Sequence, residues 1–126
     1  MKKNNKKILL AEDEEFLSKA LVYKLKGEGF EVFSAHDGKE ALNIARKEKP
    51  DLILLDIAMP KISGLEVLEE IKNNKILKKI PVIMISNLSQ EKDIKESISR
   101  GACSYMVKSN FSMKEIVEKV KEQLEI

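Results

Sequence analysis

The hydrophobic residues of this chain fall into two alternating kinds of segment. Short runs that are almost entirely apolar are typical of strands in a sheet covered on both faces. Longer segments with an apolar residue every three or four positions are typical of amphipathic helices. The short runs predict five strands, at residues 8–11, 30–34, 52–55, 81–86 and 104–107.

The run 52–55 is predicted to be the central strand, because all four of its residues are large aliphatics. For so short a run, periodicity alone leaves a buried helix segment open. Pro60 favours the strand, because it biases Met59 away from helical dihedral angles and makes the chain turn just after Asp56. Residues 30–34 include the polar Glu31 and end on the polar Ser34, which suits an edge strand.

Each predicted strand is followed by a segment with helical spacing. The predicted helices cover about 15–26, 37–49, 63–73, 90–100 and 112–126. Capping boxes open three of them, at Asp37 to Glu40, Ser63 to Glu66 and Ser112 to Glu115. Left-handed caps are predicted at Gly27 and Gly101. The fourth helix has only Ile94 and Ile98 as its apolar stripe, so we expect it to be the least firmly packed.

Strict alternation of five strands and five helices indicates an α/β fold. Right-handed crossovers between parallel strands give the doubly wound architecture, with helices on both faces of one sheet. The 126 residues contain no internal repeat and no linker, so we expect a single domain over 1–126, with residues 1–6 as a flexible basic tail. The last predicted helix runs to Ile126, so we expect no output domain.

Charge and composition exclude several classes of function. Because 23 Lys and Arg nearly balance 21 Asp and Glu, the net charge of +2 makes no case for nucleic-acid or membrane binding. The apolar run 8–11 after the basic start is too short for a signal peptide or a membrane span, so a cytoplasmic protein is expected. The single Cys103 excludes an internal disulfide.

Polar side chains stand at the carboxyl ends of four of the five predicted strands. They are Glu12 and Asp13, Asp56, Ser86 and Lys108. Taken one at a time, such residues are often helix caps, turn residues or solvated charges. Because the carboxyl ends of parallel strands meet at one edge of a sheet, where open α/β sheets bind ligands, we interpret them together as a site.

Three carboxylates at one edge repel one another unless a cation relieves the repulsion. Oxygen ligands of this kind suit Mg²⁺, which binds through one or two carboxylates plus phosphate oxygens. Asp56 is the best candidate nucleophile, because it follows the central strand. Lys108 would offset charge on a phosphoryl group and Ser86 would donate a hydrogen bond to it.

These residues resemble the receiver domains of two-component response regulators, the CheY-like family. The resemblance covers nearly the whole chain and is carried by residues 8–14, Asp56 to Pro60 with Gly64, 83–86 and 101–108. It implies a flavodoxin-like fold with strand order 2-1-3-4-5. It also implies that Asp56 is phosphorylated by a sensor histidine kinase or a phosphotransfer protein. Such a switch catalyses only its own phosphorylation and dephosphorylation.

The resemblance further implies a role for each residue of the site. Mg²⁺ is bound by Asp13, Asp56 and the carbonyl of Ala58, with Glu12 acting through water. Lys108 and Ser86 hold the phosphoryl group, and Tyr105 is the aromatic switch that turns inward as Ser86 moves. The last strand and last two helices then present a surface to a downstream protein or output domain, and the protein is a monomer or a phosphorylation-dependent dimer.

The chain departs from the family pattern at three places, Glu12, Asn87 and Ser109, and it has Ala58 and Leu88 at the two positions that flank the path of attacking water in the family. Glu12 stands where aspartate is usual, with little expected effect. Ser109 replaces the proline that often follows the lysine, so the Lys108–Ser109 bond is expected to be trans or its loop less rigid. Asn87 either narrows access to Asp56 or adds a hydrogen bond. Ala58 and Leu88 cannot orient an attacking water, which predicts slow loss of the phosphoryl group.

Three other functions fit the sequence less well. A pseudo-receiver, acting as a phosphorylation-independent interaction module, would not need the set Asp13, Asp56, Ser86 and Lys108. An aspartyl-phosphate hydrolase would need a second acid two residues after Asp56, where Ala58 stands. A flavin-binding module is disfavoured because residues 12–15 are all acidic and would repel the cofactor phosphate.

Overall fold

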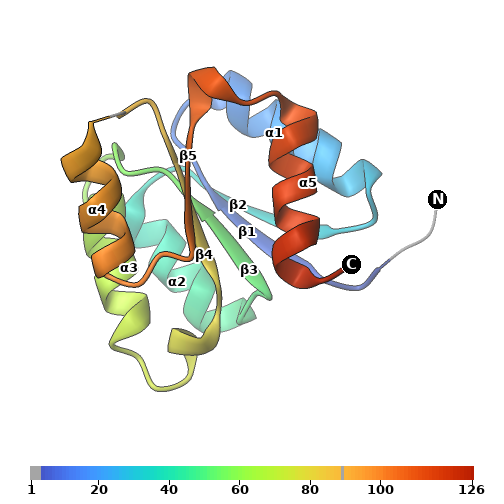
Figure 1. Cartoon of the computed structure of the whole chain (residues 1–126). Helices are drawn as coiled ribbons and strands as arrows, with labels where there is room; N and C mark the ends of the chain where they lie inside the picture. Colours follow the sequence, from blue (N-terminus) through green and yellow to red (C-terminus); the bar gives the residue numbers. More distant parts are fainter. Residues whose placement is uncertain (1–3, 89) are drawn as a thin grey trace.

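The computed structural model describes residues 4–88 and 90–126, which form one five-stranded parallel sheet with helices on both faces (Figure 1). The strands are β1 (Lys7–Ala11), β2 (Glu31–Ala35), β3 (Leu52–Leu55), β4 (Val82–Ser86) and β5 (Ser104–Val107). The helices are α1 (Glu15–Gly27), α2 (Gly38–Glu48), α3 (Gly64–Lys72), α4 (Glu91–Ser99) and α5 (Met113–Leu124), with 3-10 turns η1 (Leu77–Lys79) and η2 (Lys108–Asn110). The sheet order β2-β1-β3-β4-β5 confirms the predicted fold.

β3 lies at the centre of the sheet and serves two hydrophobic cores. Ile53 and Leu55 point to the face covered by α2 and α3, and Leu52 and Leu54 point to the face covered by α1 and α5. All four are fully buried. Because successive strand residues face opposite sides, a continuous apolar run is what a strand covered on both faces requires.

The predicted apolar stripe of α4 is wrong at one of its two positions. Ile98 is 46% exposed, and the neighbouring Ser97 is fully buried in its place. Successive side chains of an α-helix point about 100° apart around its axis. An apolar stripe of only two residues therefore does not determine which side of the helix faces the core. No residue of α4 belongs to either core cluster among the described residues.

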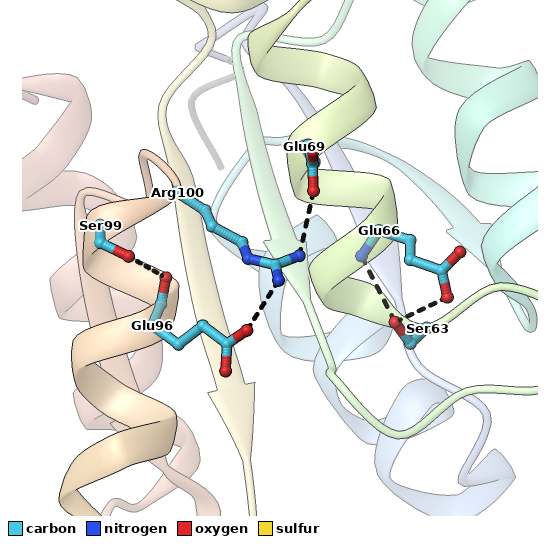
Figure 2. Close-up of polar contacts among 6 residues, drawn as sticks. All are labelled: Ser63, Glu66, Glu69, Glu96, Ser99 and Arg100. Atoms are coloured by element: carbon cyan, nitrogen blue, oxygen red, sulfur yellow. Dashed lines mark hydrogen bonds and ion pairs between the residues drawn. The ribbon is translucent and has the colours of Figure 1, made fainter.

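Arg100, at the end of α4, ties this helix to α3. Figure 2 shows its guanidinium group between two carboxylates: one nitrogen lies 3.1 Å from an oxygen of Glu69 on α3, and the other lies 2.7 Å from an oxygen of Glu96 on α4. These polar contacts supplement the sparse apolar packing of α4.

The helix caps follow the sequence with two corrections. Each of Asp37, Ser63 and Ser112 accepts a hydrogen bond from the amide three residues later, but among the described residues only Glu115 returns a bond to the backbone amide of its cap, so one of the three predicted capping boxes is complete. Gly101 has the predicted left-handed conformation. Gly27 was predicted to be a left-handed cap, but it is the last residue of α1, and the glycine with positive φ is Gly29. The chain continues for one more residue, Glu28, before it reverses.

Residues 4–6 of the predicted flexible tail are held by backbone hydrogen bonds. The amide of Asn4 donates to the carbonyl of Gly29, and the carbonyl of Lys6 accepts from the amide of Glu31. These bonds hold residues 4–6 beside the start of β2. Residues 1–3 of the predicted tail lie outside the described residues.

Candidate functional site

Lys108 lies at the centre of the predicted site. Its ammonium nitrogen is 2.7 Å from Glu12 Oε1 and 2.9 Å from Asp56 Oδ2, and 3.8 Å from Glu14 Oε2. Burial opposes the charge on this amine, but the contacts with Glu12 and Asp56 outweigh burial and raise the pKa of Lys108. The lysine is therefore held in its charged form among three carboxylates.

The sheet register brings two of these carboxylates together. Ala11 pairs with Leu55 across β1 and β3, so the next residues, Glu12 and Asp56, leave the sheet side by side. The amide of Asp56 also donates to the carbonyl of Ala11 at 3.0 Å. With the exposed Asp13, they place oxygens within 4.8 Å of one another.

Gly64 allows α3 to approach the backbone of Asp56. A Cβ atom on Gly64 would lie 2.0 Å from the carbonyl oxygen of Asp56, and the amide of Gly64 donates to the carbonyl of Ile57 at 2.7 Å. Only glycine fits such a close approach. The side chain of Asp56 also accepts a hydrogen bond from the amide of Ala58 at 3.3 Å, so both the backbone and the side chain of Asp56 are fixed.

One oxygen of the buried Glu12 carboxylate lacks a well-aligned hydrogen-bond donor among the described residues. The side chain of Glu12 is fully buried, and burial raises its pKa although Lys108 and the amide of Glu14 act in the opposite direction. Oε2 accepts from the amide of Glu14 at 2.9 Å, but Oε1 accepts no hydrogen bond of good geometry among the described residues, despite its closeness to Lys108. A buried oxygen of this kind, next to two other carboxylates, fits a hard cation or its water.

Ser86 and Tyr105 meet at the loop after β4. Ser86 is buried and its hydroxyl accepts a hydrogen bond from the amide of Leu88 at 3.2 Å. The hydroxyl of Tyr105, on β5, donates to the carbonyl of Leu88 at 2.6 Å. Burial raises the pKa of Tyr105. Leu88 thus links the residue predicted to contact phosphate with the predicted switch residue.

These groups line a pocket of about 270 Å³ at the carboxyl edge of the sheet. Its lining consists of Asp13, Glu14, Asp56, Ala58, Ser86, Asn87, Leu88 and Lys108. A larger open groove of about 530 Å³ runs between α2 and α3 and contains none of the predicted site residues. Of these two hollows, the smaller one is therefore where the predicted site residues gather.

The structure brings together the acids, the hydroxyl and the lysine that the sequence selected. It adds two features that the sequence analysis missed: the direct contact of Glu12 with Lys108, and Glu14, which approaches Lys108 and donates its amide to Glu12. Glu14 stood in the acidic run without an assigned role. Its position two residues after Glu12, in the turn into α1, was the available signal. The Lys108–Ser109 bond is trans, one of the two predicted alternatives.

Comparison with known proteins agrees with this geometry. Residues 8–121 match the family model of the response regulator receiver domain. The chain is 41% identical to the alkaline phosphatase synthesis transcriptional regulatory protein PhoP of Bacillus subtilis over 93% of its own length, but it spans only 48% of that protein. It is 34% identical to the polar-differentiation response regulator DivK of Brucella anthropi, covering 94% of this chain and 96% of DivK.

The fold is also similar to a solved structure. A CheY-like response regulator receiver domain protein from Methanospirillum hungatei superposes with a TM-score of 0.90, at 28% identity over 97% of this chain and 95% of that one. Each helix in the described part of the chain is too short or too polar to cross a membrane. The family match, these relatives and the fold lead to one conclusion: this chain belongs to the response regulator receiver domain family.

Proposed function

We propose that this receiver is a phosphorylation-activated switch whose phosphoryl acceptor is Asp56. The observation that carries the proposal is the position of Asp56, which is buried, adjacent to Glu12 and Asp13, and 2.9 Å from the Lys108 amine. An interaction module that works without phosphorylation has no need for a buried lysine shared by three carboxylates.

In the proposed reaction, a carboxylate oxygen of Asp56 attacks the phosphorus of a phosphohistidine on a sensor kinase or phosphotransfer protein. The new O–P bond forms as the P–N bond breaks, and the histidine leaves as the neutral imidazole after taking up a proton. Lys108 and the hydroxyl of Ser86 face the same pocket and would stabilise the charge on the transferred oxygens.

The acids of the pocket fit a magnesium ion. Asp13, Asp56 and the carbonyl of Ala58 would bind it directly, and Glu12 would act through water. When bound, Mg²⁺ offsets the charge of the phosphoryl oxygens during transfer. Asp13 is exposed and lines the pocket, and the buried Oε1 of Glu12 lies 2.7 Å from the Lys108 amine.

Phosphorylation would be transmitted through Ser86, Leu88 and Tyr105. If the hydroxyl of Ser86 moves to the phosphoryl group, it must release the amide of Leu88, whose carbonyl holds Tyr105. We propose that this exchange changes the surface formed by α4, β5 and α5, which a downstream protein or output domain recognises. A monomer or a phosphorylation-dependent dimer is consistent with such a surface.

The test is intact mass after incubation with Mg²⁺ and acetyl phosphate, on wild type and Asp56→Asn in parallel. We expect one added phosphoryl group in the wild type only, and none when Mg²⁺ is chelated. If neither acetyl phosphate nor beryllofluoride modifies or binds the wild type, the protein is a pseudo-receiver. Partner binding by the unmodified chain would then be the function to measure.

The phosphoryl group is expected to persist. Ala58 and Leu88 line the pocket and have no side-chain group to orient an attacking water. The measurement is the decay of the phosphorylated mass after the phosphodonor is removed, compared between the wild type and Ala58→Asn. We expect slower decay in the wild type, and a wild-type half-life of a few seconds would contradict this prediction.

A further inference from the structure

The turn between α3 and β4 carries an uncompensated positive charge. The chain has no acidic residue between Glu70 and Glu91, and this stretch includes Lys75, Lys78 and Lys79. All three lysines are exposed, and within the described residues none of them forms an ion pair. Ile76 lies among them and is 66% exposed. We call these four residues the basic turn.

The basic turn is held in a defined shape. The side chain of Asn74 accepts from the amides of Ile76 and Leu77, and Leu77 is buried in the core beneath the turn. The amine of Lys72 donates to the carbonyls of Lys78 and Ile80. Because the backbone of the turn is already ordered, a partner that binds the exposed Ile76 causes little further loss of conformational entropy in this chain.

The basic turn lies at the opposite edge of the sheet from the phosphorylation site. Figure 1 shows the turn in yellow at the lower end of the molecule, beneath α3 and α4. β4 starts just after the turn and ends at Ser86, and its five residues rise by about 3.3 Å each. A partner on the basic turn would therefore not cover Asp56.

We propose that the basic turn binds an acidic segment of a partner protein, with Ile76 inserted against an apolar side chain of that segment. The positive charge of the turn favours carboxylate groups on the partner. Lysine ammonium groups can pair with carboxylates in many orientations, whereas the planar arginine side chain favours a fixed bidentate geometry. Nucleic acid is a poorer fit, because the turn has no arginine and no aromatic residue. Three lysines also fall short of the roughly four to eight that recognise anionic membranes.

The test is an NMR titration of the ¹⁵N-labelled chain with a synthetic amphipathic peptide of glutamate and leucine, at low and at moderate salt. We expect shifts centred on residues 74–80 that weaken as salt rises. Charge reversal in Lys75→Glu/Lys78→Glu/Lys79→Glu should weaken the dissociation constant about tenfold. Ile76→Ser, which keeps the charges, should weaken it severalfold.

The matched control is Lys24→Glu/Lys92→Glu/Lys114→Glu, which changes the net charge equally at exposed lysines outside the turn. Equal loss of binding in the control and in the turn variant would overturn the proposal, because net charge alone would then explain it. Absence of shifts in the turn would also overturn it, as would tighter binding to phosphatidylserine vesicles or to a DNA duplex. Binding should be the same in Asp56→Asn, so failure of phosphorylation leaves this result unchanged.

Discussion

At the scale of the residue, one lysine offsets part of the negative charge of the acidic cluster. Lys108 contacts Glu12 and Asp56 with only 11% of its side chain exposed, and it occupies the position from which a cation would attract the same oxygens. Lys108 and a bound divalent ion must therefore compete for these carboxylates.

Replacement of Lys108 by an uncharged residue should strengthen Mg²⁺ binding. In Lys108→Met we expect Mg²⁺ to bind at least about tenfold more tightly, because the acids lose their only close positive neighbour among the described residues. The metal-free variant should lose about 1–3 kcal/mol of stability from its unpaired buried carboxylates. Isothermal titration calorimetry measures the first effect and urea unfolding the second. Unchanged Mg²⁺ affinity, equal to that of the exposed control Lys92→Met, would contradict the competition.

A second residue-scale prediction concerns Gly64. In Gly64→Ala the new methyl group would collide with the backbone of Asp56, and backbone cannot yield as a flexible side chain can. We expect a loss of about 3 kcal/mol or more in the free energy of unfolding. The control is Gly27→Ala, where a Cβ meets nothing within 4 Å. That change should be neutral or stabilise the helix by up to about 1 kcal/mol. Equal stability of the two variants in urea unfolding would disprove the close approach.

At the scale of the element, α4 is the helix with the least apolar attachment. Its fully buried residue is Ser97, whose hydroxyl has no hydrogen-bond partner among the described residues. A helix that buries a polar group and exposes Ile98 gains little from its packing, so its ion pairs through Arg100 make up a larger share of its attachment. Weak attachment suits an element whose surface is proposed to change on phosphorylation.

Ser97→Ala should therefore stabilise the protein. Removal of an unsatisfied buried hydroxyl and the higher helix propensity of alanine together predict a gain of about 1 kcal/mol in thermal or urea unfolding. Ser99→Ala on the same helix is the control, because its exposed hydroxyl donates to the carbonyl of Glu96. The control should show only the smaller propensity effect. Destabilisation by Ser97→Ala would mean that the hydroxyl has a partner.

At the scale of the whole molecule, two cores share one sheet. Leu54 belongs to the core beneath α1 and α5, and Leu55 to the core beneath α2 and α3. The cores are separated only by the strands that supply both, so neither can unfold while the other keeps its sheet.

Shortening a core side chain on either face of the sheet should therefore destabilise the whole molecule. Leu54→Ala and Leu55→Ala are each expected to cost about 2–5 kcal/mol, with a single unfolding transition. Circular dichroism of the helices and NMR signals of core methyl groups should give coincident urea curves in both variants. A transition in which one core's methyl signals disappear first would show that the cores are independent.

The sequence was sufficient to predict which polar residues gather at the carboxyl edge of the sheet, because the topology is simple. Once five apolar runs were assigned to parallel strands, the polar residues after them had to share one edge, so Asp13, Asp56, Ser86 and Lys108 could be selected without coordinates. The contact between Glu12 and Lys108 was not predictable in this way. It depends on which way two long side chains turn, and this is set by the burial around them.

What the sequence determined by itself is local or periodic: the strands, most caps, the sheet class and the residues at its carboxyl edge. Hydrophobic period and capping chemistry act over a few neighbouring residues, so they can be predicted from the chain alone. Only the tertiary structure decided the rotation of α4, the contact of Gly64 with Asp56, and the lysine shared by the acids of the pocket. Each of these depends on packing between segments far apart in the chain, where a shift of one residue or one rotamer changes which atoms meet.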